Sequence, residues 1–406
     1  MLHLIPAHQT RPADDPIFAL NREATERRAR GEVIINATVG ALLDDEGKLA
    51  ILPSSARAVR EVSDDEWAAY APISGTPDFL RAVIADLFEG HRGLADTAIA
   101  AATPGGSGAL RHAIANYLEP GQALLTTSFF WGPYLTLADE ADRRVATFEM
   151  FKRGPDGAVQ GIDVAALDRS LGELLTKQSR ALIFLNDPCH NPTGYSMTPA
   201  EWNDVANCLR EHGKRAPVTV MLDMAYTAYA ANDPRAHFGR ILELLDTVGV
   251  LFAWSASKSF THYGLRVGAI VACIPDAKER TMTEAAFSYS CRGTWSNCNR
   301  GGLRAITRLL VDPELSAACK TEREGLKRLL NARVTSFNTH AKDAKLRYPR
   351  YEGGFFVTIF HDDAQAKAAR MREQGVFVVP QKGALRVALC SVAERDVPRL
   401  VQTLAE

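Results

Sequence analysis

The sequence predicts an α/β protein with a mostly parallel sheet, joined to a smaller α+β block. Between about residues 122 and 275, short apolar runs alternate with amphipathic segments, the pattern of strand–helix units. The runs are rich in β-branched and aromatic residues and too continuous for half-exposed strands, so helices should cover both faces of the sheet. At 406 residues the chain is too long for one compact core, which predicts two or more domains.

Five apolar runs are expected to form the strands of this sheet. They are residues 122–130, 181–188, 218–226, 250–257 and 268–275. The segments between them at 198–212 and 235–247 are amphipathic and predict helices. Thr198 followed by Glu201 has the spacing of a capping box at the start of the first helix.

The C-terminal part of the chain predicts a separate mixed domain. Helical sequence dominates at 313–344, and a strand-like run follows at 353–360. A helix is expected at 363–374, two short strands at 375–380 and 384–390, and a closing helix from Ala393. Residues 1–14 contain two prolines and few large apolar side chains beyond the first five, so they are interpreted as an arm.

Composition favours a small-molecule partner. Hydrophobic residues make up 46% and charged residues 23%, and the formal net charge is -1, so there is no basic field for nucleic acid or an anionic membrane surface. None of the seven cysteines pairs at zinc-finger or CxxC spacing, so no metal site is expected and a reducing cytoplasm fits best. The N-terminus lacks a signal-peptide pattern, and no run of about 18 apolar residues predicts a membrane span.

The motif TPGGSGALRHAI, residues 103–114, combines three glycines and Ser107 with an apolar helical pattern. A glycine turn that opens a helix offers free backbone N–H groups to an anion, and the helix dipole adds to the attraction. Arg111 stands where the dinucleotide fingerprint needs its third glycine, and the P-loop lysine is absent. The motif therefore indicates either a phosphate site or a plain tight turn.

Two polar motifs follow the ends of predicted strands, where open α/β sheets bind their ligands. NDPCHNPTG at 186–194 places the amide of Asn191 at such an end, although a bare loop is the alternative. In LDMAY, Asp223 lies within an otherwise apolar strand and Tyr226 follows three residues later. A buried carboxylate needs a charged or strongly donating partner, either a protonated ring nitrogen of a ligand or a structural ion pair.

The string WSASKSFTHYGLRVGA, residues 254–269, places Lys258 just past an apolar strand among small and hydroxyl-bearing residues. Desolvation there lowers the pKa of a lysine and makes its amine a nucleophile for an aldehyde. Arg266, eight residues on, suits a phosphate, and the glycines at 264 and 268 allow close backbone approach. The alternative is a surface lysine at a strand end.

Taken in order, these motifs resemble the fold-type I, class I aminotransferases, closest to the aspartate and aromatic amino acid branch. The resemblance runs over nearly the whole chain, from DPIFAL at 15–20 through the glycine turn, HNPTG, DMAY and SASKSF to the arginine of ALRVALC. It implies a pyridoxal-phosphate-dependent aminotransferase with a mostly parallel seven-stranded sheet. It also implies a large domain at 48–319 and a small domain that combines 15–47 with 320–406.

The resemblance implies catalytic roles for Lys258, Asp223 and Tyr226. Lys258 would bind the cofactor covalently as an imine and then move the α-proton of the substrate. Asp223 would keep the pyridine nitrogen protonated, so that the ring acts as an electron sink. Tyr226 and Asn191 would donate to the phenolate oxygen. The other expected cofactor contacts are Gly105, Gly106, Ser107, Trp131, Ser255 and Arg266.

For the substrate, the resemblance implies that Arg386 binds the α-carboxylate through a bidentate ion pair. Arg292 aligns with the arginine that binds the distal carboxylate of aspartate or glutamate from the partner subunit. Tyr70 matches a tyrosine that reaches the phosphate of the neighbouring subunit, so a homodimer with shared sites is expected. Gly40, Asn191 and Trp131 complete the implied substrate contacts.

The amino donor is left open by departures from the family pattern. The branch often reads RxNYSNPP after the distal arginine, whereas this chain reads RGTWSNCNRGG. Leu42 also stands where dicarboxylate enzymes commonly carry a tyrosine. The leading hypothesis is transamination of an acidic or aromatic amino acid with 2-oxoglutarate. Another reaction at Cα (β-lyase, decarboxylase or cyclase) and a non-catalytic regulator on the same fold stay as alternatives, although an intact Lys258 argues against the regulator.

Overall fold

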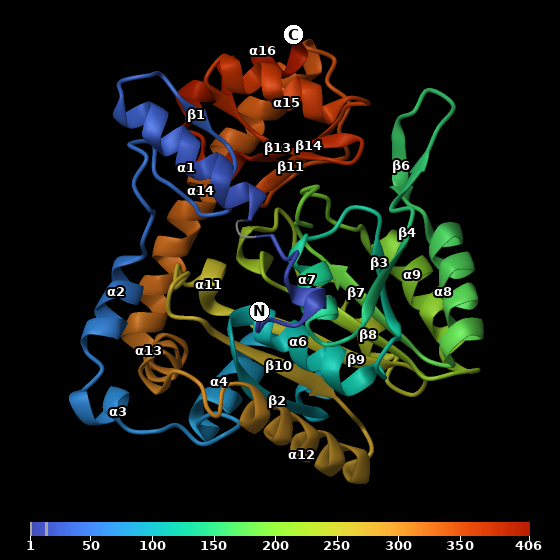
Figure 1. Cartoon of the computed structure of the whole chain (residues 1–406). Coiled ribbons are helices and arrows are strands. Elements are labelled where there is room, and N and C mark those ends of the chain that lie inside the picture. The colour runs from blue at the N-terminus through green and yellow to red at the C-terminus, as the bar shows by residue number, and fades with distance from the viewer. Residues whose placement is uncertain (1, 13–14) are drawn as a thin grey trace. The chain divides into compact units, whose positions relative to one another are not determined.

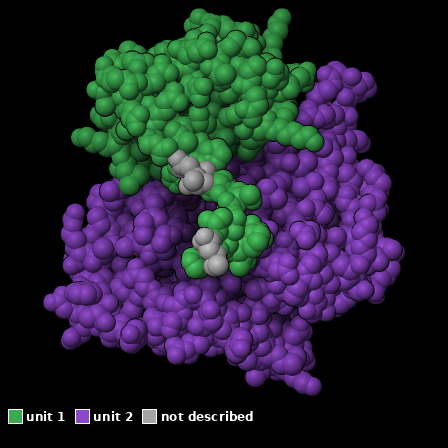
Figure 2. Space-filling view, viewed as in Figure 1, with its two compact units in different colours: residues 1–49, 332–348, 356–406 green, residues 50–331, 349–355 purple. Residues whose placement is uncertain are grey.

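The computed structural model describes residues 2–12 and 15–406, which divide into two compact units (Figure 2). The larger unit comprises residues 50–331 and 349–355, and the smaller unit comprises 1–49, 332–348 and 356–406. The domain boundaries that the family resemblance implies, 47/48 and 319/320, stay a prediction. The expected N-terminal arm, 1–14, includes residues 1, 13 and 14, which lie outside the described residues.

A seven-stranded sheet forms the centre of the larger unit, which confirms the predicted α/β class (Figure 1). Its strand order is β2-β10-β9-β8-β7-β3-β4, and β10 alone runs antiparallel to its two neighbours. The strands are β2 (Ala98–Pro104), β3 (Ala123–Thr127), β4 (Arg144–Phe148), β7 (Ala181–Asn186), β8 (Val218–Asp223), β9 (Gly249–Ser255) and β10 (Val267–Cys273). A small hairpin, β5 (Phe151–Arg153) with β6 (Val159–Ile162), lies outside this sheet.

Helices cover both faces of the sheet, as the continuous apolar runs predict. Every residue of β7, β8 and β10 is buried. On β9, alternate residues face opposite sides: Ala253 joins the core beneath α6, α7 and α12, whereas the ring of Trp254 packs against Phe79 of α4. Helices α8 and α9 accompany α4 on that second side (Figure 1). Phe238 of α10 packs there against Phe252 of β9.

The helices of the larger unit begin and end with standard local signals. The predicted capping box is confirmed, because Thr198 and Glu201 cap α9 reciprocally. The helices are α2 (Pro53–Arg60), α3 (Asp64–Ala68), α4 (Pro77–Leu87), α5 (Arg92–Ala95), α6 (Gly105–Tyr117), α7 (Pro133–Asp139), α8 (Val164–Gln178), α9 (Pro199–Gly213), α10 (Phe238–Leu242), α11 (Ala256–Ser259), α12 (Ala277–Thr294) and α13 (Arg300–Val311).

The helix expected at 235–247 is wrong in its extent, because only α10, Phe238–Leu242, is helical there. Phe238, Ile241 and Leu244 are all buried, so the apolar spacing predicts the buried face correctly. The residues after Leu242 form turns that lead into β9 at Gly249. The chain must reach the strand within a few residues, and this requirement ends the helix early.

The smaller unit combines helices with a three-stranded antiparallel sheet of order β11-β14-β13. Its strands β11 and β14 are buried throughout, and a short parallel pair joins β1 to β12. Its elements are α1 (Pro16–Ala29), β1 (Ile35–Asn36), β11 (Phe356–Phe360), α15 (Ala364–Glu373), β12 (Val376–Phe377), β13 (Val379–Gln381), β14 (Ala384–Ala388) and α16 (Val397–Ala405). The long α14 (Pro313–Asp343) contributes its C-terminal part, where the buried Arg333 pairs with Asp45 at 2.7 Å.

Among residues 2–12 and 15–406, no helix combines the length and apolar character that crossing a membrane requires.

Candidate active site

The ends of four strands meet at one edge of the large sheet. The last residues of β7 and β8, Asn186 and Asp223, are direct partners in the parallel register. On β9, Ser255 lies two residues beyond Ala253, the partner of Asp223. Because β10 runs antiparallel, its start rather than its end reaches this edge, and this places Arg266 there. Residues that are far apart in sequence are thus gathered at the carboxyl end of the parallel strands.

The glycine motif opens α6 at the same edge of the sheet. Gly105 has a φ of +66°, a backbone conformation that residues with a Cβ rarely adopt. An added Cβ at Gly268 of β10 would lie 2.4 Å from the carbonyl carbon of Gly105. The missing side chains therefore allow the first turn of α6 to approach β10 closely. The predicted turn is thus the N-terminus of a 13-residue helix, which favours an anion nearby.

A cavity of about 230 Å³ opens over this edge. It is lined by Gly106, Ser107, Leu110, Trp131, Asn186, Asn191, Asp223, Ala225, Tyr226, Ser255, Ser257, Lys258, Tyr263 and Arg266. Nine of these residues were singled out from the sequence: Gly106, Ser107, Trp131, Asn191, Asp223, Tyr226, Ser255, Lys258 and Arg266. The amine, the buried carboxyl group and the glycine turn therefore share one cavity.

Asp223 provides the buried acid of the cavity. Its side chain is 7% exposed, and burial raises the pKa of its carboxyl group to about 6. The hydroxyl of Tyr134 donates to Oδ2 at 3.0 Å, and the backbone N–H of Ala225 donates to Oδ1 at 3.3 Å. These two bonds favour the charged form but do not offset the desolvation. A cationic partner from a ligand would complete the compensation.

An amide network fixes the neighbouring donors. Asn186 donates through Nδ2 to the carbonyl oxygen of Asp223 at 2.8 Å and accepts from the backbone N–H of Asn191 at 2.6 Å. Asn191 in turn donates through Nδ2 to the hydroxyl of Tyr226 at 3.2 Å. All of these groups are buried. The network therefore holds Asn191 and Tyr226 side by side in fixed positions.

Lys258 lies in α11, the short helix that begins directly after β9. Its Nζ stands 4.4 Å from the ring centroid of Tyr263 and 5.8 Å from that of Phe355. Aromatic faces of this kind orient a cation without supplying a counter-charge. The amine therefore projects from a rigid strand–helix junction into the cavity that also contains Asp223.

The polar groups of the cavity fit pyridoxal phosphate. Arg266 donates through Nη1 to Ser257 Oγ at 3.3 Å, and an added Cβ at Gly105 would lie 2.6 Å from its Nη2. The guanidinium, the serine hydroxyls and the start of α6 together form a cradle suited to a phosphate. Asp223 suits a protonated ring nitrogen, Lys258 suits an aldehyde carbon, and Trp131 offers an aromatic face for the ring.

Several predicted residues lie outside the cavity lining. Gly105 lies one residue before the lining, and a Cβ added to it would lie 2.6 Å from Arg266 Nη2. Tyr70 is 87% exposed, and Arg292 is exposed at the end of α12, where it donates to Ser296 Oγ at 2.7 Å.

Arg386 and Gly40 belong to the smaller unit. The guanidinium of Arg386, on the central strand β14, stands 4.8 Å from the ring centroid of Phe356 and donates to the carbonyl oxygen of Thr38. An added Cβ at Gly40 would lie 2.5 Å from the same Phe356 ring. Both residues therefore flank one aromatic side chain.

Sequence reasoning missed five residues that matter here: Leu110, Asn186, Ser257 and Tyr263 of the lining, and Tyr134 behind Asp223. The position of Asn186 immediately before a strand-end loop could have identified it. For Tyr134 the sequence gives no such signal, because its contact with Asp223 spans 89 positions.

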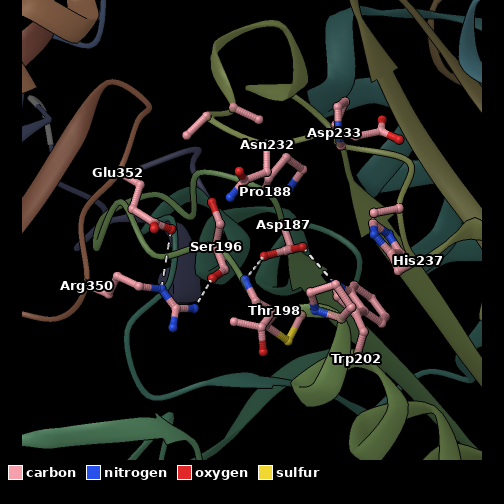
Figure 3. Close-up of a pocket in the computed structure, with 16 residues that line it drawn as sticks. Asp187, Pro188, Ser196, Thr198, Trp202, Asn232, Asp233, His237, Arg350 and Glu352 are labelled. Carbon is pink, nitrogen blue, oxygen red and sulfur yellow. Dashed lines mark hydrogen bonds and ion pairs between the residues drawn. The ribbon is translucent and has the colours of Figure 1, made fainter.

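Asp187, the residue after Asn186, lines a different cavity of about 230 Å³ (Figure 3). Its carboxylate accepts from Met197 N and from Trp202 Nε1, both at 2.8 Å, and burial raises its pKa to about 7. Arg350 is the cation among the described lining residues, which include neither lysine nor glycine. Of these two cavities, the first is therefore the one that offers both an amine and a phosphate cradle.

Comparison with known proteins agrees with this chemistry. The family model for aminotransferase class I and II matches residues 32–404. The aromatic-amino-acid aminotransferase of Paracoccus denitrificans is 25% identical over 97% of both chains. The mitochondrial aspartate aminotransferase of Schizosaccharomyces pombe is 29% identical over 82% of this chain and 75% of its own. A crystal structure of an aminotransferase from Anaerococcus prevotii, 32% identical, superposes with a TM-score of 0.92 and covers 100% of this chain and 99% of its own.

Proposed function

Because the chain belongs to the class I and II aminotransferases, a pyridoxal-phosphate-dependent family, we propose that it transfers the amino group of an acidic or aromatic L-amino acid to 2-oxoglutarate. The observation that carries the proposal is that Lys258, Asp223 and Arg266 line a single cavity. Aminotransferases for both donor classes are among the relatives of this chain.

Pyridoxal phosphate, when bound, supplies an electron sink for the negative charge that develops at Cα of the substrate. Lys258 is proposed to hold the cofactor and then to carry a proton from Cα through its freed Nζ. Asp223 would keep a proton on the ring nitrogen, and Tyr226 with Asn191 would donate to the phenolic oxygen. Gly106, Ser107, Ser255 and Arg266 would bind the phosphate, while Arg386 would bind the substrate α-carboxylate.

The proposed substrate and cofactor contacts of Arg292 and Tyr70 require a second copy of the chain. Both side chains are exposed in the single chain, and neither lines its cofactor cavity. We therefore include a homodimer with shared active sites in the proposal. In this arrangement Arg292 of one copy would bind the distal carboxylate of a substrate held by the other.

An amino-exchange assay tests the proposed reaction. The purified protein with pyridoxal phosphate is incubated with aspartate, phenylalanine or tyrosine, with and without 2-oxoglutarate. We expect one glutamate for each oxo acid formed from the donor, and no turnover without the acceptor. Acceptor-independent release of ammonia or carbon dioxide would overturn the proposal in favour of a lyase or decarboxylase.

Arg292→Ala is expected to lower kcat/KM for aspartate by about 100-fold, because a buried ion pair to a carboxylate contributes roughly 3 kcal/mol. The value for phenylalanine should change much less, since that substrate has no distal charge. Arg280→Ala is the matched control, because it removes the same charge from the other end of α12. An unchanged kcat/KM for aspartate, or equal losses in the two variants, would remove the role assigned to Arg292.

A further inference from the structure

Two helices on the second face of the large sheet bring together three side chains of types that can bind a metal, Asp168 of α8 with Cys208 and His212 of α9. One ligand atom from each residue lies within 4.8 Å of the others. His212 Nε2 is 2.8 Å from Asp168 Oδ1, and Cys208 Sγ is 4.0 Å from the same oxygen. None of the three lines the cofactor cavity.

The helical geometry explains why these side chains meet. Cys208 and His212 are four residues apart and therefore lie on one face of α9. On α8, Asp168 and Gly172 have the same spacing and share a face. An added Cβ at Gly172 would stand 3.5 Å from His212 Cε1, so the glycine leaves the imidazole room to lie against α8 and reach Asp168.

The chemical kind of the donors indicates zinc. A thiolate with an imidazole selects Zn²⁺ over Mg²⁺ or Ca²⁺, which take oxygen ligands. With zinc–ligand bonds of about 2.0–2.3 Å, the donors of a tetrahedral site lie about 3.3–3.8 Å apart. The observed separations of 2.8 and 4.0 Å fall on either side of this range. Rotation of the Asp168 carboxylate, whose side chain is 64% exposed, would adjust both distances.

We propose that Asp168, Cys208 and His212 form a zinc site with three protein ligands and a fourth position open to water. On binding, zinc takes the place of the thiol proton of Cys208, which leaves to solvent, and neutral His212 coordinates through Nε2. The ion would tie α8 to α9, the helices before and after β7. It would therefore stabilise the segment that carries Asn186 into the cofactor cavity.

The hydrogen bond between His212 and Asp168 accounts for the positions of these two side chains, but not for the position of Cys208 beside them. The Cys208 sulfur lies 4.0 Å from Asp168 Oδ1, and a thiol is only a weak hydrogen-bond donor, so it contributes little to the pair. A metal would provide a reason for its position. All seven cysteines lie in the described part of the chain, and the other six are buried, so Cys208 is the thiol that a metal reaches.

The test is zinc titration of the tag-free, cofactor-loaded protein by isothermal calorimetry. One zinc ion per chain is expected. Cys208→Ser and Asp168→Asn should each weaken the affinity by at least about 10–100-fold, since even residues behind the ligands have effects of that size. Glu173→Gln, which removes an exposed charge from the same helix α8, should leave the affinity unchanged. Cobalt(II) should give a sulfur-to-metal charge-transfer band with the parent protein that is absent from Cys208→Ser.

Zinc should also raise the melting temperature of the parent protein and of Glu173→Gln, but not of the two ligand variants. Melting without metal shows that each variant is folded, and both substituted side chains are at least partly exposed. Zinc affinity unchanged in Cys208→Ser and Asp168→Asn would overturn the proposal. So would the absence of zinc binding by the folded parent protein.

Discussion

Lys258→Ala is expected to lower kcat by at least about 10⁴-fold, the upper range for loss of a positioned general base. The loss should be larger than for any other single change, because the same Nζ is proposed to hold the cofactor and to move the substrate proton. In the structure this amine lies 4.4 Å from the ring centroid of Tyr263 and 5.8 Å from that of Phe355, and Lys258 lines the cavity that contains Asp223. No second lysine lines that cavity among the described residues.

Kinetics and mass spectrometry together check this expectation. Borohydride treatment of the parent protein should add the mass of one reduced cofactor per chain, whereas the variant should gain none. Lys278→Ala, which removes an exposed lysine from α12, should retain both activity and labelling. Covalent labelling of Lys258→Ala together with substantial activity would contradict the assignment.

The fold class could be predicted from the sequence because the central strands are buried on both faces. β7, β8 and β10 are continuous apolar runs, and such runs have one simple interpretation in an α/β protein. Two strands of the sheet were missed for physical reasons. β2 is mostly alanine, which has low strand propensity, and β4 is an edge strand with exposed or half-exposed residues at four of its five positions.

The candidate site could be predicted where its residues follow strand ends in the sequence. Lys258, Asp223 and Asn191 each lie at or just beyond such an end, and the sheet brings those ends together. Residues that reach the site through helix packing give no sequence signal of this kind. Tyr134 is the example, since the placement of α7 over the sheet alone brings it to Asp223.

Asp223→Asn is expected to lower kcat by about 10²–10³-fold, the size of effect seen when a preorganised charge partner is lost. An amide cannot balance a protonated ring nitrogen, so the cofactor would be a weaker electron sink. Tyr134→Phe leaves the carboxylate in place and removes one hydrogen bond to it. Its activity should therefore fall by only about tenfold, consistent with one bond to a charged group.

Asp223→Asn should also stabilise the cofactor-free protein above pH 6. The pKa of Asp223 is about 6 in the folded chain, against 3.8 as its ordinary value. Between these pH values the unfolded chain has already lost this proton while the folded chain retains it, so stability falls as pH rises and then levels off. Two pKa units correspond to roughly 3 kcal/mol at most. An asparagine does not ionise and avoids this loss.

Melting temperatures of the cofactor-free proteins at pH 4, 6 and 8 would separate the two effects. Asp223→Asn should melt above the parent at pH 8, with a difference that shrinks towards pH 4. Tyr134→Phe should melt below the parent at pH 8, because it loses a donor that stabilises the carboxylate. A lower melting temperature for Asp223→Asn than for the parent at pH 8 would contradict this expectation, because it would show that burial of the Asp223 charge does not destabilise the folded protein. The buried Asp223 carboxylate is expected to destabilise the cofactor-free protein and to support catalysis once the cofactor is bound. Such a trade-off between stability and activity is expected at a site that keeps a charge for its ligand.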